Sequence, residues 1–181
     1  MSLVNDTDQP WGGPVAFSLQ TLDGEVRSHH DEHIEVPARG VLTLPVRPEL
    51  STPQDPSTEA LIVSMGPGLV VHTFVEDVDL RLNPAPLEAS ANALAGGYEI
   101  TVKAHSLARD ITLHVDRLDP AASVDHALVT LPAGAEWSFK VSSDVEGLDP
   151  AQFLSSAVLR TANDLRAVPT QALDSTAATT A

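Results

Sequence analysis

Cysteine is absent from this 181-residue sequence, and aromatic residues make up only 4% of it. The absence of cysteine excludes disulfides, thiolate metal ligands and cysteine nucleophiles, and it fits a reducing compartment. Basic residues are also scarce: Lys and Arg number 10 against 25 Asp and Glu, which gives a formal net charge of -15. Because a surface this negative repels phosphate groups, we expect neither nucleic acid nor a membrane surface as a partner.

Long apolar runs are missing as well. No stretch reaches the roughly 18 apolar residues that a membrane-spanning helix needs. Met1 to Asp6 contain no basic segment that leads into an apolar run. We therefore expect no signal peptide and a cytoplasmic protein, provided that the true N-terminus is present. What the sequence does contain is 43% hydrophobic residues, which is enough to bury a core.

Most of the chain alternates between apolar and polar residues, the pattern of strands with one buried and one solvated face. Turn signals such as Asp23-Gly24 and Gly96-Gly97 separate the runs. Short strands without intervening helical patterns favour an all-β fold of antiparallel β-sandwiches. Tyr98 and Trp137 lie on the apolar sides of their runs, so we expect both in a core. The alternating runs cover residues 15–19, 61–65, 98–102, 111–115 and 137–141.

A stiff, extended stretch near the middle of the chain predicts a domain boundary. Asn83-Pro84-Ala85-Pro86 has two prolines, which restrict the backbone and suit a crossing between domains. We expect a first sandwich over residues 1–80 and a second over residues 81–147.

The sequence pattern changes again after Gly147. Asp149 and Pro150 suit the start of a helix, and Gln152 completes a capping box. Apolar residues then follow at helical spacing from Phe153 to Leu165. We expect one amphipathic helix over residues 148–168 that packs back onto the sandwiches, and a disordered tail over residues 169–181.

The sequence offers no recognisable catalytic residues. Retaining glycoside hydrolysis needs two carboxylates about 5–5.5 Å apart in a pocket. The acidic residues here fall in turns and on the polar sides of strands, and Glu76, Asp77 and Asp79 form the densest group. The sequence also lacks a Gly-x-Ser-x-Gly elbow and a glycine-rich phosphate loop. We predict no catalytic residue and no cofactor.

Two weaker candidates for a binding site deserve consideration. His29, Asp31 and His33 would share one face of a strand, and these residue types bind zinc. A flat strand rarely surrounds a metal without ligands from a second strand, so a polar hairpin arm is the favoured interpretation. Trp11, beside Gly12-Gly13, could present its indole ring to a sugar or plug the end of a sandwich. A small metal-binding protein and a free-standing carbohydrate-binding or adhesion module therefore remain alternatives.

Several motifs resemble one protein family. They are the stretch Ala104-His105-Ser106-Leu107-Ala108-Arg109-Asp110, the turn Leu131-Pro132-Ala133-Gly134-Ala135-Glu136, the segment Val4-Asn5-Asp6-Thr7 followed by Trp11, and the segment Leu159-Arg160-Thr161-Ala162-Asn163-Asp164-Leu165. Together they resemble the C-terminal immunoglobulin-like region of β-mannosidases of glycoside hydrolase family 2, particularly those of actinobacteria.

This resemblance implies two immunoglobulin-like sandwiches, the first truncated at its N-terminal end. It also implies that catalysis happens elsewhere, because the family's catalytic glutamates lie in a (β/α)8 barrel and the acid/base glutamate follows an asparagine. This sequence contains no Asn-Glu pair. The resemblance thus implies a non-catalytic accessory region whose partner is the barrel of the parent enzyme. That parent would hydrolyse terminal β-D-mannose residues, although related members act on β-galactosides or β-glucuronides.

Overall fold

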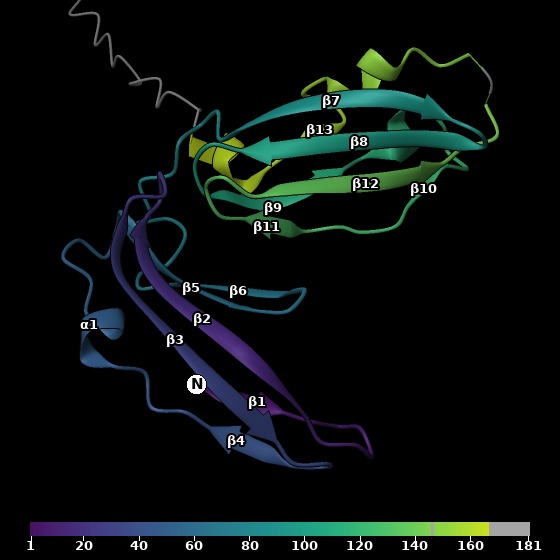
Figure 1. The fold of residues 1–181 in the computed structure, drawn as a ribbon. Coiled ribbons are helices and arrows are strands. Elements are labelled where there is room, and N and C mark those ends of the chain that lie inside the picture. The colour runs from purple at the N-terminus through teal and green to yellow at the C-terminus, as the bar shows by residue number, and fades with distance from the viewer. Residues whose placement is uncertain (146, 167–181) are drawn as a thin grey trace, which may run out of the picture.

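A computed structural model describes residues 1–145 and 147–166 of the chain. Antiparallel strands dominate, and they form two groups that lie at an angle to each other (Figure 1). The first group, drawn in purple to blue, spans residues 2–73, and the second, drawn in teal to yellow-green, spans residues 87–160. The predicted all-β sandwich fold is confirmed. Within the described residues, no helix is long and apolar enough to cross a membrane.

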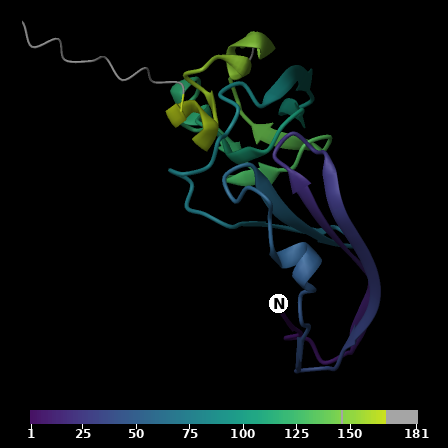
Figure 2. The same ribbon diagram turned by 90° about the vertical axis from the view of Figure 1, so that its left-hand side faces the viewer.

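The first unit has a four-stranded antiparallel sheet in the order β3-β2-β5-β6, which faces a two-stranded sheet of β1 and β4. The short helix α1 lies against the concave side of the long β2–β3 ribbon (Figure 2). Its Leu50 enters the core beside Phe17 and Val36. The elements are β1 (Ser2–Val4), β2 (Trp11–Thr21), β3 (Val26–Val36), β4 (Val41–Thr43), α1 (Pro48–Ser51), β5 (Glu59–Met65) and β6 (Gly68–Thr73).

Strand β5 is buried on both faces. Leu61 and Val63 point into the core of the first unit. Ala60 and Ile62 point the opposite way, into a second apolar cluster that includes Leu80, Leu82 and Leu107. This follows from the continuous apolar run in β5, because successive strand residues point to opposite faces.

The second unit is a sandwich of two sheets, with strand orders β10-β12-β8-β7 and β11-β9-β13. Between the sheets lie the fully buried Ile100 and Phe139, which are opposite one another in β8 and β12. The elements are β7 (Leu87–Leu94), β8 (Gly97–Ala104), β9 (Ala108–Leu113), the 3-10 turn η1 (Val115–Arg117), β10 (Ser123–Val124), β11 (Val129–Leu131), β12 (Glu136–Ser142), η2 (Pro150–Leu154), β13 (Leu159–Arg160) and η3 (Ala162–Arg166).

The two aromatic residues expected in the second core differ in their burial. Tyr98 is buried, as predicted, and its ring centroid lies 4.6 Å from that of Phe153. Trp137 is only partly buried and packs against the margin of the cluster. Its indole ring meets the imidazole of His126 edge-on, with 5.0 Å between the centroids.

The prediction of one amphipathic helix over residues 148–168 is wrong for the described residues 148–166, and its last two residues lie outside the described part of the chain. Asp149 does cap a helical turn, because its Oδ1 accepts a hydrogen bond of 3.0 Å from the backbone N–H of Ala151. However, only the 3-10 turn η2 forms, and the chain is already extended at Ser155. Its hydroxyl donates to the carbonyl of Gln152, a local bond that competes with a helix. Beyond it, β13 pairs with β9 and η3 follows.

The apolar residues of this C-terminal segment nevertheless pack back onto the second sandwich. Phe153 and Val158 are buried in its core, as the prediction of packing within this chain required. Leu165 instead is 72% exposed. The tail predicted over residues 169–181 lies outside the described residues.

Candidate functional site

The three proposed metal ligands lie on one solvent-facing side of β3. His29 Nε2 is 3.1 Å from Asp31 Oδ1. Opposite them on β2 stand Ser18 and Ala16, and Pro14 is opposite His33, so the paired strand contributes no imidazole or carboxylate. Over residues 1–145 and 147–166, no three His, Asp or Glu side chains form a group that could hold a metal ion. The alternation on β3 is as expected, but it does not bring together a ligand set.

Trp11 lies in the first position of β2, opposite Val36. It is partly buried and packs against the first core. With Pro10, His33 and Glu35 it also lines a shallow hollow of about 260 Å³. Trp11 thus contributes both to the end of the sandwich and to a small polar depression.

Two of the acidic residues act as hydrogen-bond acceptors within the fold. In the dense group near residue 77, Asp77 Oδ2 accepts a hydrogen bond of 3.1 Å from Arg109 Nη2. Asp119 is 5% exposed and accepts a hydrogen bond of 2.6 Å from the Ser143 hydroxyl and another of 2.9 Å from the N–H of Ala121. These two hydrogen bonds, of which the one from Ser143 has the larger effect, hold the pKa of Asp119 below its ordinary value of 3.8.

Two glutamates do share one hollow, of about 240 Å³, on the outer face of the second unit. Glu88 and Glu136 lie on β7 and β12, each directly opposite Lys103 on the intervening strand β8. Two strand spacings put their backbones about 9–10 Å apart, and Lys103 Nζ lies 3.8 Å from Glu88 Oε1. This row is an exposed charge ladder and does not resemble a catalytic pair.

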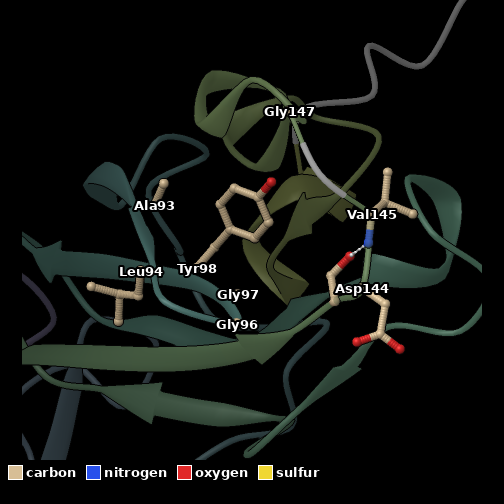
Figure 3. Close-up of a pocket in the computed structure, with 9 residues that line it drawn as sticks. Ala93, Leu94, Gly96, Gly97, Tyr98, Asp144, Val145 and Gly147 are labelled. Carbon is tan, nitrogen blue, oxygen red and sulfur yellow. Dashed lines mark hydrogen bonds between the residues drawn. The ribbon is translucent and has the colours of Figure 1, made fainter.

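The pocket at the end of the second unit has a volume of about 380 Å³ and is shown in Figure 3. Tyr98 forms part of its wall, and its hydroxyl donates to the backbone carbonyl of Leu148 at 3.3 Å. The hydroxyl of Ser143 accepts a hydrogen bond from the N–H of Val145. Asp144 is the one carboxylate among the described residues of the wall, so they hold no pair of carboxylates.

The two edges of the four-stranded sheet in the first unit differ in character. Edge strand β3 carries four formally charged residues, among them Arg27 and Glu35, and charge protects an edge from pairing with other chains. Edge strand β6, with the sequence Gly-Leu-Val-Val-His-Thr, carries none. Its Leu69 and Val70 are 40% and 58% exposed. Strand β6 therefore presents an unprotected apolar edge.

Part of that exposed surface lies on the core-facing side of the sheet. Val70 is directly opposite Val63, and His72 is opposite Leu61. Directly paired residues point to the same face, and Val63 and Leu61 both enter the first core. The sheet of β1 and β4 therefore leaves the core-facing side of β6 uncovered.

Sequence reasoning missed the role of two buried asparagines. Asn5 is 1% exposed, and its amide group bonds to Gln9, Pro37 and Thr7. Asn163 is 0% exposed and bonds to Asn83 and to the nearby pair Leu107 and Arg109, in two separate segments of the chain. The signal in the sequence was an Asn-Asp pair, which occurs in two of the family-like motifs as Asn5-Asp6 and as Asn163-Asp164.

Among the comparisons with known proteins, one solved structure supports the fold. No family model and no curated protein matches the sequence. Among solved structures, the β-D-mannosidase from Dictyoglomus thermophilum matches 90% of this chain at 18% identity, with a TM-score of 0.67. The exo-chitosanase CsxA from Amycolatopsis orientalis matches 78% of it at 15% identity, with a TM-score of 0.47. The chain spans 20% and 22% of these proteins. The resemblance is therefore confirmed at the level of fold: this chain folds like about a fifth of a solved β-mannosidase.

Proposed function

We propose that the chain is a non-catalytic accessory region of a β-mannosidase of glycoside hydrolase family 2. The family-like motifs support this proposal, as does a solved β-mannosidase in which the same fold makes up 20% of a longer chain. In this proposal the barrel of the parent enzyme supplies the catalytic carboxylates, and the two sandwiches pack against it and stabilise it.

The observation that carries the proposal is the uncovered core-facing side of β6. Val70 is 58% exposed although it stands on the same face as the buried Val63. An apolar side chain on the inner face of a sandwich is normally covered by the opposite layer. The barrel-containing part of the parent is the proposed cover. Exposed apolar surface of this kind marks interaction sites in soluble proteins.

An antibody raised against this chain tests the proposal in an extract of the source organism. We expect it to detect a polypeptide much larger than 19.1 kDa and to deplete β-mannosidase activity from the extract. Depletion of β-galactosidase or β-glucuronidase activity instead would contradict the proposed β-mannoside substrate but would still support an accessory role in a glycosidase. A free 19.1 kDa protein that depletes no glycosidase would contradict both.

A second candidate function is a carbohydrate-binding module, and the hollow beside Trp11 favours it. An indole next to polar His33 and Glu35 is a surface on which a sugar ring can stack. Affinity electrophoresis through a gel with embedded β-mannan tests this. If the chain binds mannan at this hollow, the embedded mannan retards the unmodified chain but not Trp11→Ala. The control His126→Ala, which changes a residue of the second unit, should be retarded like the unmodified chain.

A further inference from the structure

The contact between the two units is apolar and also includes a backbone hydrogen bond. Leu22 and Ile62 come from the first unit, Leu82 from the connection, and Leu107 from the turn between β8 and β9. All four are buried. The N–H of Leu107 also donates a hydrogen bond of 2.6 Å to the carbonyl of Leu22. The turn that carries Leu107 and the connection that carries Leu82 are thus the parts of the chain that fix one unit on the other.

Asn163, from the C-terminal segment, holds these same two parts together. Its Nδ2 donates to the carbonyl of Leu107 at 2.9 Å and to the carbonyl of Asn83, the residue after Leu82, at 2.8 Å. Its Oδ1 accepts a hydrogen bond of 2.9 Å from the N–H of Arg109. The side chain of Arg109 then reaches Asp77, which lies in the connection just after the first unit. Every one of these bonds lies at the junction.

The segment that carries Asn163 is itself held rigidly. The carboxylate of Asp164 accepts hydrogen bonds of 3.1 Å and 3.0 Å from the N–H and the hydroxyl of Thr161. Arg160 Nε lies 2.8 Å from the same carboxylate. Just before it, Leu159 and Arg160 pair with β9. Asn163 is therefore presented from a fixed turn that is anchored in the second sandwich.

We propose that this segment, residues 159–165, is a clasp that sets the angle between the two sandwiches. The clasp belongs to the second unit. Through Asn163 it fixes the orientation of the first unit, and with it the direction in which the exposed β6 edge points. The buried amide matches its three partners in donors and acceptors, so each loss would leave a buried polar group unpaired. Water would then enter the junction and the two units would move relative to each other. This inference does not depend on the proposed function.

Spin labels on the two units measure the angle directly, because the absence of cysteine allows single labels at chosen positions. We would label Asp31→Cys on β3 and Ser90→Cys on β7, both exposed strand positions, and record the distance distribution by double electron–electron resonance. The test variant is Asn163→Asp, which keeps the shape and the Oδ1 acceptor but loses both donated hydrogen bonds. The matched control is Asn5→Asp, the same change at a buried asparagine inside the first unit.

We expect a narrow distribution for the unmodified chain, at least a doubling of its width in Asn163→Asp, and no change in Asn5→Asp. An unchanged width in folded Asn163→Asp, or equal broadening in the control, would overturn the proposal. If Asn163→Asp does not fold, Asp164→Asn decides, because it loosens the turn and keeps Asn163. Broadening in Asp164→Asn supports the clasp, and an unchanged distribution overturns it.

Discussion

Replacement of Phe153 by alanine tests whether the C-terminal segment is an integral part of the second sandwich. Phe153 is 1% exposed and packs against Tyr98, with 4.6 Å between the ring centroids. It comes from a short 3-10 turn, which has little stability without its tertiary contacts. The side chain therefore anchors the turn as well as filling the core.

The expected loss can be estimated from these contacts. Truncation of a buried phenylalanine to alanine costs about 3–5 kcal/mol. Part of that loss is the aromatic contact with Tyr98, worth about 0.5–1.5 kcal/mol beyond the buried area. Since whole domains are stable by only about 5–15 kcal/mol, the variant should lose a large part of its stability. At about 2–4 °C per kcal/mol for a chain of this size, the melting temperature should fall by roughly 6–20 °C.

Urea unfolding followed by tryptophan fluorescence measures this loss. In a Trp11→Phe background, the remaining Trp137 packs against the cluster that Phe153 enters. Leu165→Ala is the matched control, because Leu165 belongs to the same segment but is 72% exposed, and it should change stability by less than about 0.5 kcal/mol. A loss under about 1 kcal/mol in Phe153→Ala would refute the packing described here.

Four further predictions follow from the same structure. The purified chain should not hydrolyse 4-nitrophenyl β-mannoside, and turnover that vanishes on mutation of one of its own carboxylates would contradict this. Trp137→Ala should cost about 2 kcal/mol in urea unfolding, less than the 3–5 kcal/mol of a core position, because the indole is partly buried. The Ser143 hydrogen bond stabilises ionised Asp119, so its contribution to folding stability is fully present above pH 3.8 and is lost as the pH falls through the lowered pKa of Asp119. In a titration of stability against pH, Asp119→Asn should therefore flatten the fall in stability on the acid side, and an unchanged fall would exclude this role. Calorimetry should detect no sub-micromolar zinc binding, whereas tight binding that disappears in a His29→Ala, His33→Ala double variant would restore the metal hypothesis.

The strands were predictable because their pattern is local. In β12, Phe139 and Val141 point into the core, and the exposed Lys140 stands between them. The same local reasoning failed for the C-terminal segment, because the apolar residues from Phe153 to Leu165 follow the spacing of a helix although no such helix forms. Pairing of β13 with β9 overrides that spacing, and the partners of β13 lie more than forty residues earlier in the sequence, at Leu113 and Thr112. A local pattern cannot reveal such a competitor.

The junction between the units was hidden for a similar reason. The motif around Asn163 was visible as a family resemblance, but its hydrogen-bond partners lie 54 to 80 residues away in the sequence. The apolar run of β5 was visible too, but only the fold shows that Ile62 faces Leu107 of the second unit. Sequence reasoning recovered the alternating strands and the all-β fold, and it could not recover how the two units meet.

The double burial of β5 has a consequence for how the molecule melts. Leu61 and Ile62 are neighbours in one strand but belong to separate clusters, one inside the first unit and one between the units. The strand cannot leave its sheet without opening the junction, and the junction cannot open without exposing one face of the strand. Heat should therefore unfold both sandwiches together, in a single calorimetric peak whose van't Hoff enthalpy equals its calorimetric enthalpy. For thermal unfolding, the two sandwiches would then behave as one cooperative unit.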